Sequence, residues 1–146
     1  MSVRIHATTL AIEGHGVMLM GPSGSGKSDL ALRLIDRGAR LVSDDYSEVA
    51  VVAGELRATA PPTIAGKIEV RGLGIVAMPY LPDIAVALVV RLGGAVARMP
   101  EPGESTDIAG IAVPVVTLDA FESSAPIKVE LAIKVELALR AAREAL

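Results

Sequence analysis

The most informative segment of this 146-residue chain is Gly21-Pro22-Ser23-Gly24-Ser25-Gly26-Lys27-Ser28. It matches in full the pattern G-x-x-x-x-G-K-[S/T], a loop that cradles nucleotide phosphates. Backbone N–H groups of such a loop curl around phosphate oxygens, and the helix that follows adds its positive N-terminal end. Lys27 is expected to reach the β- and γ-phosphates, and the Ser28 hydroxyl to hold Mg²⁺. Residues 21–28 are therefore predicted to bind a nucleoside triphosphate.

The residues on both sides of this phosphate loop fit a strand–loop–helix unit. Val17–Met20 is a short continuous apolar run, which is typical of a strand buried on both faces. After the loop, apolar residues between Leu30 and Ile35 share one helical face, and Gly38 ends the helix. The alternative is a chance glycine-rich turn, which need not lie between a buried strand and a helix. The flanking pattern thus favours a true phosphate loop.

The remaining pattern predicts an α/β fold in which strands dominate. Besides 17–20, we expect strands at 4–12, 39–42, 48–53, 64–70, 75–77, 84–92 and 111–118. A hairpin loop is expected at Glu13–Gly16, a long mobile loop at Gly93–Gly110, and an amphipathic helix from about Ile127. Because no linker or repeat divides the chain, we expect a single domain, residues 1–146, with a P-loop-containing mixed β-sheet, a helix after the loop and a C-terminal helix.

Composition excludes several classes of protein. The net charge is −3 and only 2% of residues are aromatic, so the basic face and stacking platforms of a general nucleic-acid binder are not expected. The absence of cysteine excludes disulfides, thiolate metal sites and cysteine nucleophiles. Apolar runs such as Ile84–Val90 are far shorter than the roughly 18 to 20 residues of a membrane span. We expect a cytoplasmic protein without a nucleic-acid or membrane partner.

Two carboxylates are candidates for the chemistry. Asp44 and Asp45 follow the strand that comes after the phosphate-loop helix. If that strand runs parallel to Val17–Met20, both aspartates emerge at the edge of the sheet where ligands gather. One could accept a proton from an attacking hydroxyl while the other orients metal or water. A solvated turn is the alternative at this point.

Four other residues have both a functional and an ordinary interpretation. Glu69, near the end of a strand, could face Mg²⁺ together with Ser28 or be an edge-strand carboxylate. Arg98, in the long loop, could reach over the γ-phosphate like an arginine finger or be solvated. His6 fits a half-buried structural histidine on the first strand, and His15 fits a solvated residue of the hairpin loop.

Four stretches carry a resemblance to one known family. Ile5-His6 lies fifteen residues before the phosphate loop, and the loop leads into its helix. Residues 40–45 read RLVSDD, residues 60–62 read APP, and residues 68–75 read IEVRGLGI. Taken together, these stretches resemble the catalytic domain of the HPr kinase/phosphorylase family, bacterial enzymes that phosphorylate a serine of the phosphocarrier HPr and reverse this with inorganic phosphate. The family has the same histidine spacing and the similar motifs R-L-[VI]-A-D-D, A-P-P and L-E-I-R-G-L-G-I; the resemblance covers residues 4–76 and is loose from Ile84 onward.

The resemblance implies a role for each candidate residue. The implied catalytic residues are Asp44, His6, Lys27, Arg98 and Asp45. Lys27 would grip the transferred phosphoryl group, and Asp44 would take the serine proton and return one in the reverse reaction. Ser28 and Glu69 would hold Mg²⁺.

The implied function is that of an ATP-dependent protein serine kinase acting on an HPr-like phosphocarrier of a regulatory phosphotransferase system. The chain starts near the family's histidine motif, so a short form consisting of the catalytic domain is expected. Ala97 replaces the acid before the loop arginine, and Ser123-Ser124-Ala125 stands where the family has the Gly-Arg-Asn segment linked to phosphorolysis. Phosphorolysis by inorganic phosphate and homo-oligomerisation therefore stay open. The alternatives are a nucleotide-sensing module that binds a partner protein with little catalysis, and a small-metabolite kinase, which would usually carry more arginines in its lid.

Overall fold

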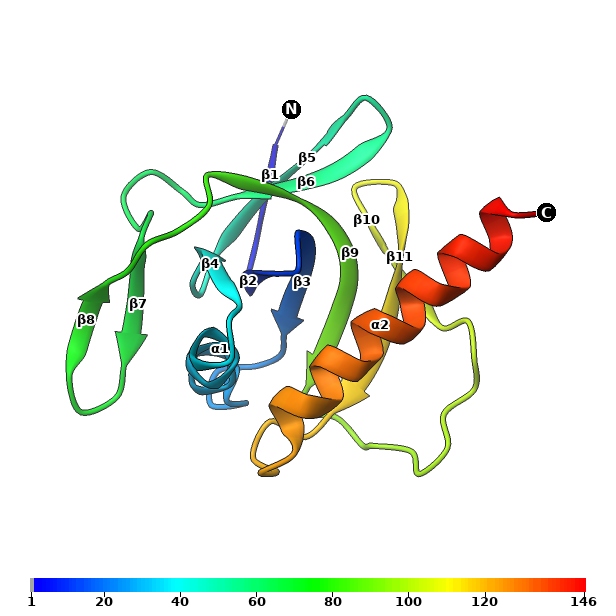
Figure 1. Cartoon of the computed structure of the whole chain (residues 1–146). Helices are drawn as coiled ribbons and strands as arrows, with labels where there is room; N and C mark the ends of the chain where they lie inside the picture. Colours follow the sequence, from blue (N-terminus) through cyan, green and yellow to red (C-terminus); the bar gives the residue numbers. More distant parts are fainter. Residues whose placement is uncertain (1) are drawn as a thin grey trace.

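Eleven strands and two helices occupy residues 2–146, the part of the chain that the computed structural model describes. The strands are β1 (Val3–Ile5), β2 (Ala7–Ile12), β3 (His15–Met20), β4 (Arg40–Ser43), β5 (Ser47–Val52), β6 (Glu55–Thr59), β7 (Lys67–Val70), β8 (Gly74–Ala77), β9 (Asp83–Leu92), β10 (Ser105–Ile108) and β11 (Ile111–Leu118). The helices are α1 (Lys27–Asp36) and α2 (Ala125–Glu144). A curled mixed sheet combined with two helices confirms the expected mixed α/β class and the C-terminal helix (Figure 1).

Strand β9 joins the parts of the main sheet. It pairs in parallel with β3 and β11 and antiparallel with β6. The strand order is β1-β5-β6-β9-β3-β2-β4, with β10 paired to β11, while β7 and β8 form a separate hairpin. Because β2 is antiparallel to both β3 and β4, these two strands run in the same direction. This meets the condition under which the aspartates after β4 emerge at the same edge as the phosphate loop.

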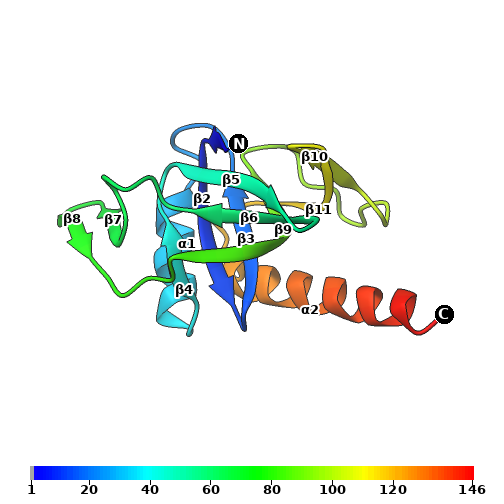
Figure 2. The ribbon, with the colours of Figure 1, turned by 90° about the horizontal axis from the view of Figure 1, so that it is seen from above.

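Alternating apolar residues of the central strands feed two hydrophobic clusters. Val17 and Leu19 of β3 pack with Leu88 of β9 against both helices. Met18 and Val89 face the other way and are covered by the curled β5–β6 part of the sheet. Both helices therefore cover one face of the sheet, and the sheet itself closes over the other (Figures 1 and 2).

Several element boundaries differ from those expected. The expected strand 4–12 is two strands, because the chain changes partners at His6: β1 pairs with β5, whereas β2 pairs with β3 and β4. The expected strand 64–70 is shortened to β7, since turns bring the N–H of Ile64 to the carbonyl of Pro61 and that of Lys67 to the carbonyl of Ile64. The hairpin turn is shorter than expected, because His15 already belongs to β3.

Two strands are not indicated by the sequence pattern. Strand β6 has the sequence ELRAT and contains only one large apolar residue, Leu56. Strand β10, STDI, lies inside the segment expected to be a loop, and it forms because β11 offers it an antiparallel partner. Both strands depend on their pairing partners rather than on strong β propensity of their own.

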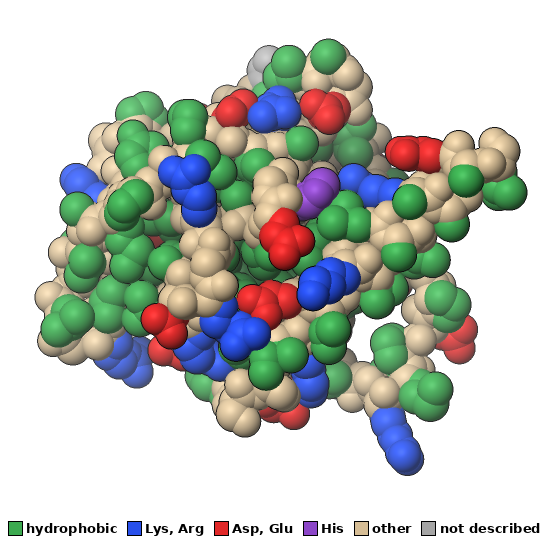
Figure 3. Space-filling view, in the orientation of Figure 1, with side chains coloured by type: hydrophobic (Ala, Val, Ile, Leu, Met, Phe, Trp, Pro, Cys, Tyr) green, Lys and Arg blue, Asp and Glu red, His purple; other side chains and the backbone are tan. Residues whose placement is uncertain are grey.

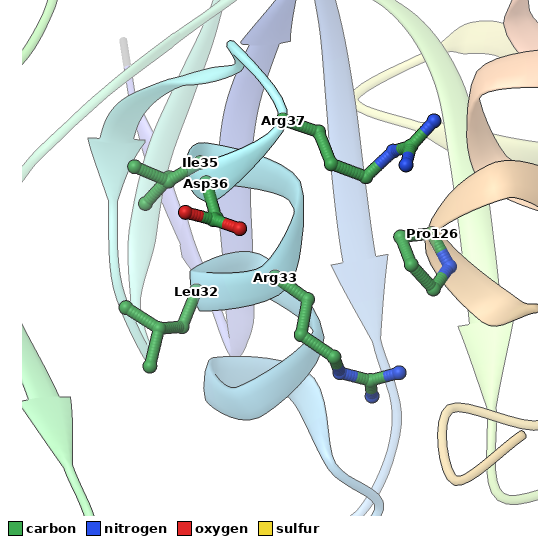
Figure 4. A pocket seen from close by; sticks show the side chains of 6 residues that line it. All are labelled: Leu32, Arg33, Ile35, Asp36, Arg37 and Pro126. Carbon is green, nitrogen blue, oxygen red and sulfur yellow. The ribbon is translucent and has the colours of Figure 1, made fainter. Parts of the chain in front are cut away.

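An open groove of about 600 Å³ separates α1 from the beginning of α2 (Figure 4). Arg33 of α1 and Arg37, the residue that caps its C-terminal end, extend toward the C-terminal part of the chain. Arg37 forms a forked pair with Glu130 of α2, with N–O distances of 2.8 to 3.1 Å. Arg33 donates to the main-chain carbonyls of Ala120 and Glu122, just before α2. The helix after the phosphate loop is thus bound to a segment almost ninety residues away.

The outer surface is mixed in character. Acidic and basic side chains are interspersed with apolar ones on the face that carries both helices (Figure 3). Helix α2 buries Val129 and Ile133 and leaves Ile127, Leu131 and Val135 about half exposed. None of the helices within residues 2–146 has the length and hydropathy to cross a membrane.

Truncating Leu34 is expected to destabilise the fold strongly. Its side chain is 0% exposed and lies in the cluster between α1 and the sheet. Leu34→Ala removes buried methyl groups and leaves a cavity, so we expect a loss of about 2 to 5 kcal/mol in the free energy of unfolding, measured by urea denaturation. Leu131→Ala is the matched control, because Leu131 is 54% exposed. Equal effects of the two substitutions would contradict the assignment of the core.

Candidate active site

The phosphate loop connects β3 to α1 and depends on its glycines for two different reasons. Gly24 and Gly26 have φ angles of 83° and 91°, a region that residues with a side chain rarely adopt. A Cβ atom on Gly21 would lie 2.5 Å from the carbonyl oxygen of Leu92, so no side chain fits there. The beginning of the loop therefore lies directly against the C-terminal end of β9.

Lys27 is a buried cation at the base of this loop. It is 6% exposed, and its Nζ atom donates to the carbonyl oxygens of Gly21 at 2.6 Å and Pro22 at 3.0 Å. Burial lowers the pKa of Lys27, and the nearby charges of Asp45 and Asp44 partly offset this effect. A desolvated ammonium group bonded only to main-chain carbonyls can gain much from an anionic ligand such as a phosphate.

Asp44 is buried where β4 ends, at 5% exposure, and three donors hold its carboxylate. Its Oδ1 atom accepts hydrogen bonds from the Thr8 hydroxyl at 3.1 Å and from the Ser28 hydroxyl at 2.8 Å. Its Oδ2 atom accepts one from the backbone N–H of Glu69 at 3.0 Å. Since a carboxylate offers about four acceptor positions, one position on Oδ2 is left for a further donor. Asp44 thus links β2, α1 and β7 in one site.

Asp45 lies next to this carboxylate but in a more exposed position. Its φ angle of 68° is unusual for a residue with a side chain, and its backbone N–H donates to the Thr8 hydroxyl at 3.0 Å. One carboxylate oxygen is 2.9 Å from Nε2 of His6. The His6 ring stacks on Tyr46, with 5.0 Å between ring centroids. The aspartate pair is therefore anchored, in contrast to a simple solvated turn.

The other predicted residues lie in different settings. Glu69 reaches Asp44 through its main chain, while its side chain is exposed on β7. Arg98 is exposed in the loop between β9 and β10, and no ion pair within residues 2–146 includes it. His15 begins β3, paired with Ile12, and is half-buried. The structure therefore brings together Lys27, Ser28, the two aspartates and His6, and leaves the side chain of Arg98 apart.

Sequence reasoning misses two polar residues of the site. Thr8 is fully buried and bonds both aspartates. Its hydroxyl donates to the carboxylate of Asp44 and accepts a hydrogen bond from the backbone N–H of Asp45. Its signal is the pair Thr8-Thr9 in an otherwise apolar strand. Ser25 has a buried hydroxyl oxygen without a hydrogen-bond partner among the described residues. A buried polar atom of this kind is usually satisfied by a water molecule or a ligand.

Comparison with known proteins gives the same result from sequence and from structure. Residues 1–133 match the family described as the HPr serine kinase C-terminal domain. The HPr kinase/phosphorylase of Clostridium tetani is 37% identical over 98 residues, which are 67% of this chain and 32% of that protein. That of Clostridium novyi is 42% identical over 85 residues, 58% of this chain and 28% of that protein. The chain thus spans about a third or less of the length of these relatives.

A solved structure supports the match across the whole fold. The structure of the HPr(Ser) kinase/phosphatase from Coxiella burnetii aligns with a TM-score of 0.84 and 25% sequence identity. The alignment covers 98% of this chain and 95% of that chain. The likeness therefore extends over almost the full length of both chains. With the family match covering nearly all of its length, the chain belongs to the HPr serine kinase C-terminal domain family.

Proposed function

We propose that the chain is an ATP-dependent protein serine kinase, which transfers the γ-phosphoryl group of ATP to a serine of an HPr-like phosphocarrier in the cytoplasm. The observation that carries this proposal is the position of Asp44. Its buried carboxylate lies 2.8 Å from the hydroxyl of Ser28, the last residue of the phosphate loop, and retains one open acceptor position. The names of the related proteins and of the family supply the class of acceptor.

The phosphate loop is proposed to bind ATP through its backbone N–H groups and the buried ammonium group of Lys27. The ammonium group of Lys27 donates to two uncharged carbonyl oxygens, those of Gly21 and Pro22. A bound triphosphate would place a negative charge next to it. The loop precedes the N-terminus of α1, whose free N–H groups also favour an anion. The phosphate loop, with Lys27 and the N-terminus of α1, would thus both bind the nucleotide and neutralise the charge of the transferred phosphoryl group.

A Mg²⁺ ion fits the donor chemistry of the site. Ser28 Oγ and the carboxylate of Asp44 lie 2.8 Å apart, and Mg²⁺ binds to such oxygen donors together with water and substrate phosphates. Ser28 and Glu69 are the proposed protein residues that hold it, with Asp44 beside them. When bound, the ion would neutralise charge on the phosphates.

In the proposed reaction, Asp44 accepts the proton of the acceptor serine on its open Oδ2 position. The serine oxygen forms a bond to the γ-phosphorus, and the bond from that phosphorus to the oxygen bridging to the β-phosphate breaks, releasing ADP. Such transfers depend mostly on positioning and charge neutralisation. Thr8 orients Asp44, while Asp45 and His6 support Asp44 from the exposed side.

We also propose a role for Arg98 and a course for the reverse reaction. Arg98 would move over the γ-phosphate when substrates are bound, because its exposed loop leaves it free of ion pairs within residues 2–146. In the reverse direction, inorganic phosphate would occupy the β-phosphate position, and one of its oxygens would form a bond to the phosphorus of the phosphoserine. The bond from that phosphorus to the serine oxygen would break, Asp44 would return a proton to this oxygen, and pyrophosphate would be released.

Intact-mass measurement of the cognate HPr-like carrier tests the proposal. The carrier is incubated with this protein, Mg²⁺ and ATP, and excess inorganic phosphate is added afterwards. We expect the carrier mass to rise by one phosphoryl group, and a carrier whose acceptor serine is replaced by alanine to stay unmodified. Reversal after phosphate addition would show phosphorolysis. An unmodified carrier in the presence of bound ATP would refute the kinase assignment and favour a nucleotide-sensing module.

A further inference from the structure

The chain contains one phenylalanine, and this residue lies beside the phosphate loop. Phe121 is 71% exposed and belongs to neither hydrophobic cluster. A Cβ atom on Gly26 would lie 3.3 and 3.4 Å from the Cε1 and Cζ atoms of the ring. The outer edge of the ring therefore lies beside the glycine that precedes Lys27, with no room for a side chain between them, while most of its surface stays open to solvent. Packing of the core does not explain a large aromatic side chain in this position.

The turn that carries Phe121 is fixed from both sides. The backbone N–H of Phe121 donates to the carboxylate of Asp119 at 2.9 Å. Arg33 of α1 donates to the carbonyls of Ala120 and Glu122, the residues before and after it. Figure 4 shows the Arg33 side chain extending from α1 toward Pro126 at the start of α2. The main chain on both sides of Phe121 is thus bound to the phosphate-loop helix.

Phe121 lies in the turn after β11, at the edge of the sheet where a nucleoside would lie. Strands β3 and β11 both run parallel to β9, so the phosphate loop after β3 and the turn after β11 emerge at the same edge. Ligands of α/β sheets bind at this edge. The loop cradles the phosphates, and the ribose and base must extend beyond the α-phosphate over a neighbouring segment. The turn after β11 is such a segment, because it contacts Gly26.

We propose that Phe121 is the platform on which the base of the bound nucleotide stacks. This inference rests on the proposed binding of ATP to the phosphate loop and adds the residue that contacts the base. Stacking on an aromatic ring changes affinity by roughly 5- to 150-fold for one base. Because every base presents a π-face, such a platform strengthens nucleotide binding with little discrimination between adenine and guanine.

Titration of the full chain with two ligands tests the platform. ATP and inorganic tripolyphosphate, each with Mg²⁺, are titrated calorimetrically into the wild type and into Phe121→Ala. We expect the dissociation constant for ATP to rise roughly 5- to 150-fold and that for tripolyphosphate to stay unchanged. Equal ATP affinity in the two proteins, or an equal loss for both ligands, would overturn the proposal. An unchanged unfolding curve shows that the variant is folded.

A second variant gives an optical signal at the same position. The chain contains no tryptophan, so Phe121→Trp introduces a single one. Its fluorescence is expected to change when ATP is added and to stay constant with tripolyphosphate, and ATP affinity should be retained. A constant signal with saturating ATP would refute stacking. If the wild type binds neither ATP nor tripolyphosphate, the proposed nucleotide site is wrong. If ATP binds and substitution of Phe121 leaves its affinity unchanged, only the stacking platform is refuted.

Discussion

Asp44→Asn is expected to slow phosphoryl transfer by about 10² to 10⁴-fold while ATP still binds. An amide cannot accept the proton of the attacking serine, so the reaction loses its proposed base. The lysine and the backbone of the phosphate loop stay in place, and these groups bind the nucleotide. The measurements are the initial rate of carrier phosphorylation and the dissociation constant for ATP, both made at saturating Mg²⁺.

The same substitution also has a structural cost. Asp44 accepts from Thr8, Ser28 and the backbone of Glu69, and the new NH₂ group will face at least one of these donors. A mismatched buried donor costs about 1 to 3 kcal/mol, which urea denaturation will detect. Asp45→Asn is the comparison, because Asp45 is exposed and bonds His6. We expect a smaller loss of rate and of stability there. Equal losses of rate in the two variants would contradict the assignment of Asp44 as the base.

Lys27→Met is expected to reduce transfer by about 10² to 10³-fold without destabilising the protein. The rate loss follows because the variant lacks the cation that stabilises charge on the transferred group. Burial lowers the pKa of Lys27, so protonating it costs stability in the folded state. That cost is fully present below the folded pKa and disappears as the pH rises through the unfolded value of 10.5. Removing the charge relieves the cost at neutral pH.

Two measurements at pH 7 check this expectation. The free energy of unfolding of Lys27→Met should stay within about 1 kcal/mol of the wild type, because the carbonyls of Gly21 and Pro22 can bond water instead. The initial rate of carrier phosphorylation should fall by about 10² to 10³-fold. Lys134→Met, on the exposed side of α2, is the control and should retain transfer. Phosphorylation of the carrier by Lys27→Met at the wild-type rate would contradict the proposed role of Lys27 and the phosphate loop in phosphoryl transfer.

The local parts of the fold were predictable because their patterns are strong. Glycine spacing and helical periodicity indicate the loop and α1, and α/β edge geometry indicates that Asp44 and Asp45 approach Ser28. The contacts of Thr8 with the aspartates and the position of Phe121 beside Gly26 were not predictable in the same way. They depend on contacts between distant segments, such as the bonds from Arg33 to residues 87 and 89 positions later. Strands β6 and β10 likewise form through pairing rather than through their own propensity.

The contact between Gly21 and Leu92 has a consequence for biosynthesis. The phosphate loop follows β3, whose parallel neighbour is β9, and β9 is translated much later than β3. While β9, which ends at Leu92, is still inside the ribosomal exit tunnel, the phosphate loop lacks the strand against which it packs. Parallel pairing between distant segments is slow, since a long stretch of chain must first be closed. Nucleotide affinity is therefore expected to arise late in translation, after β9 has left the exit tunnel.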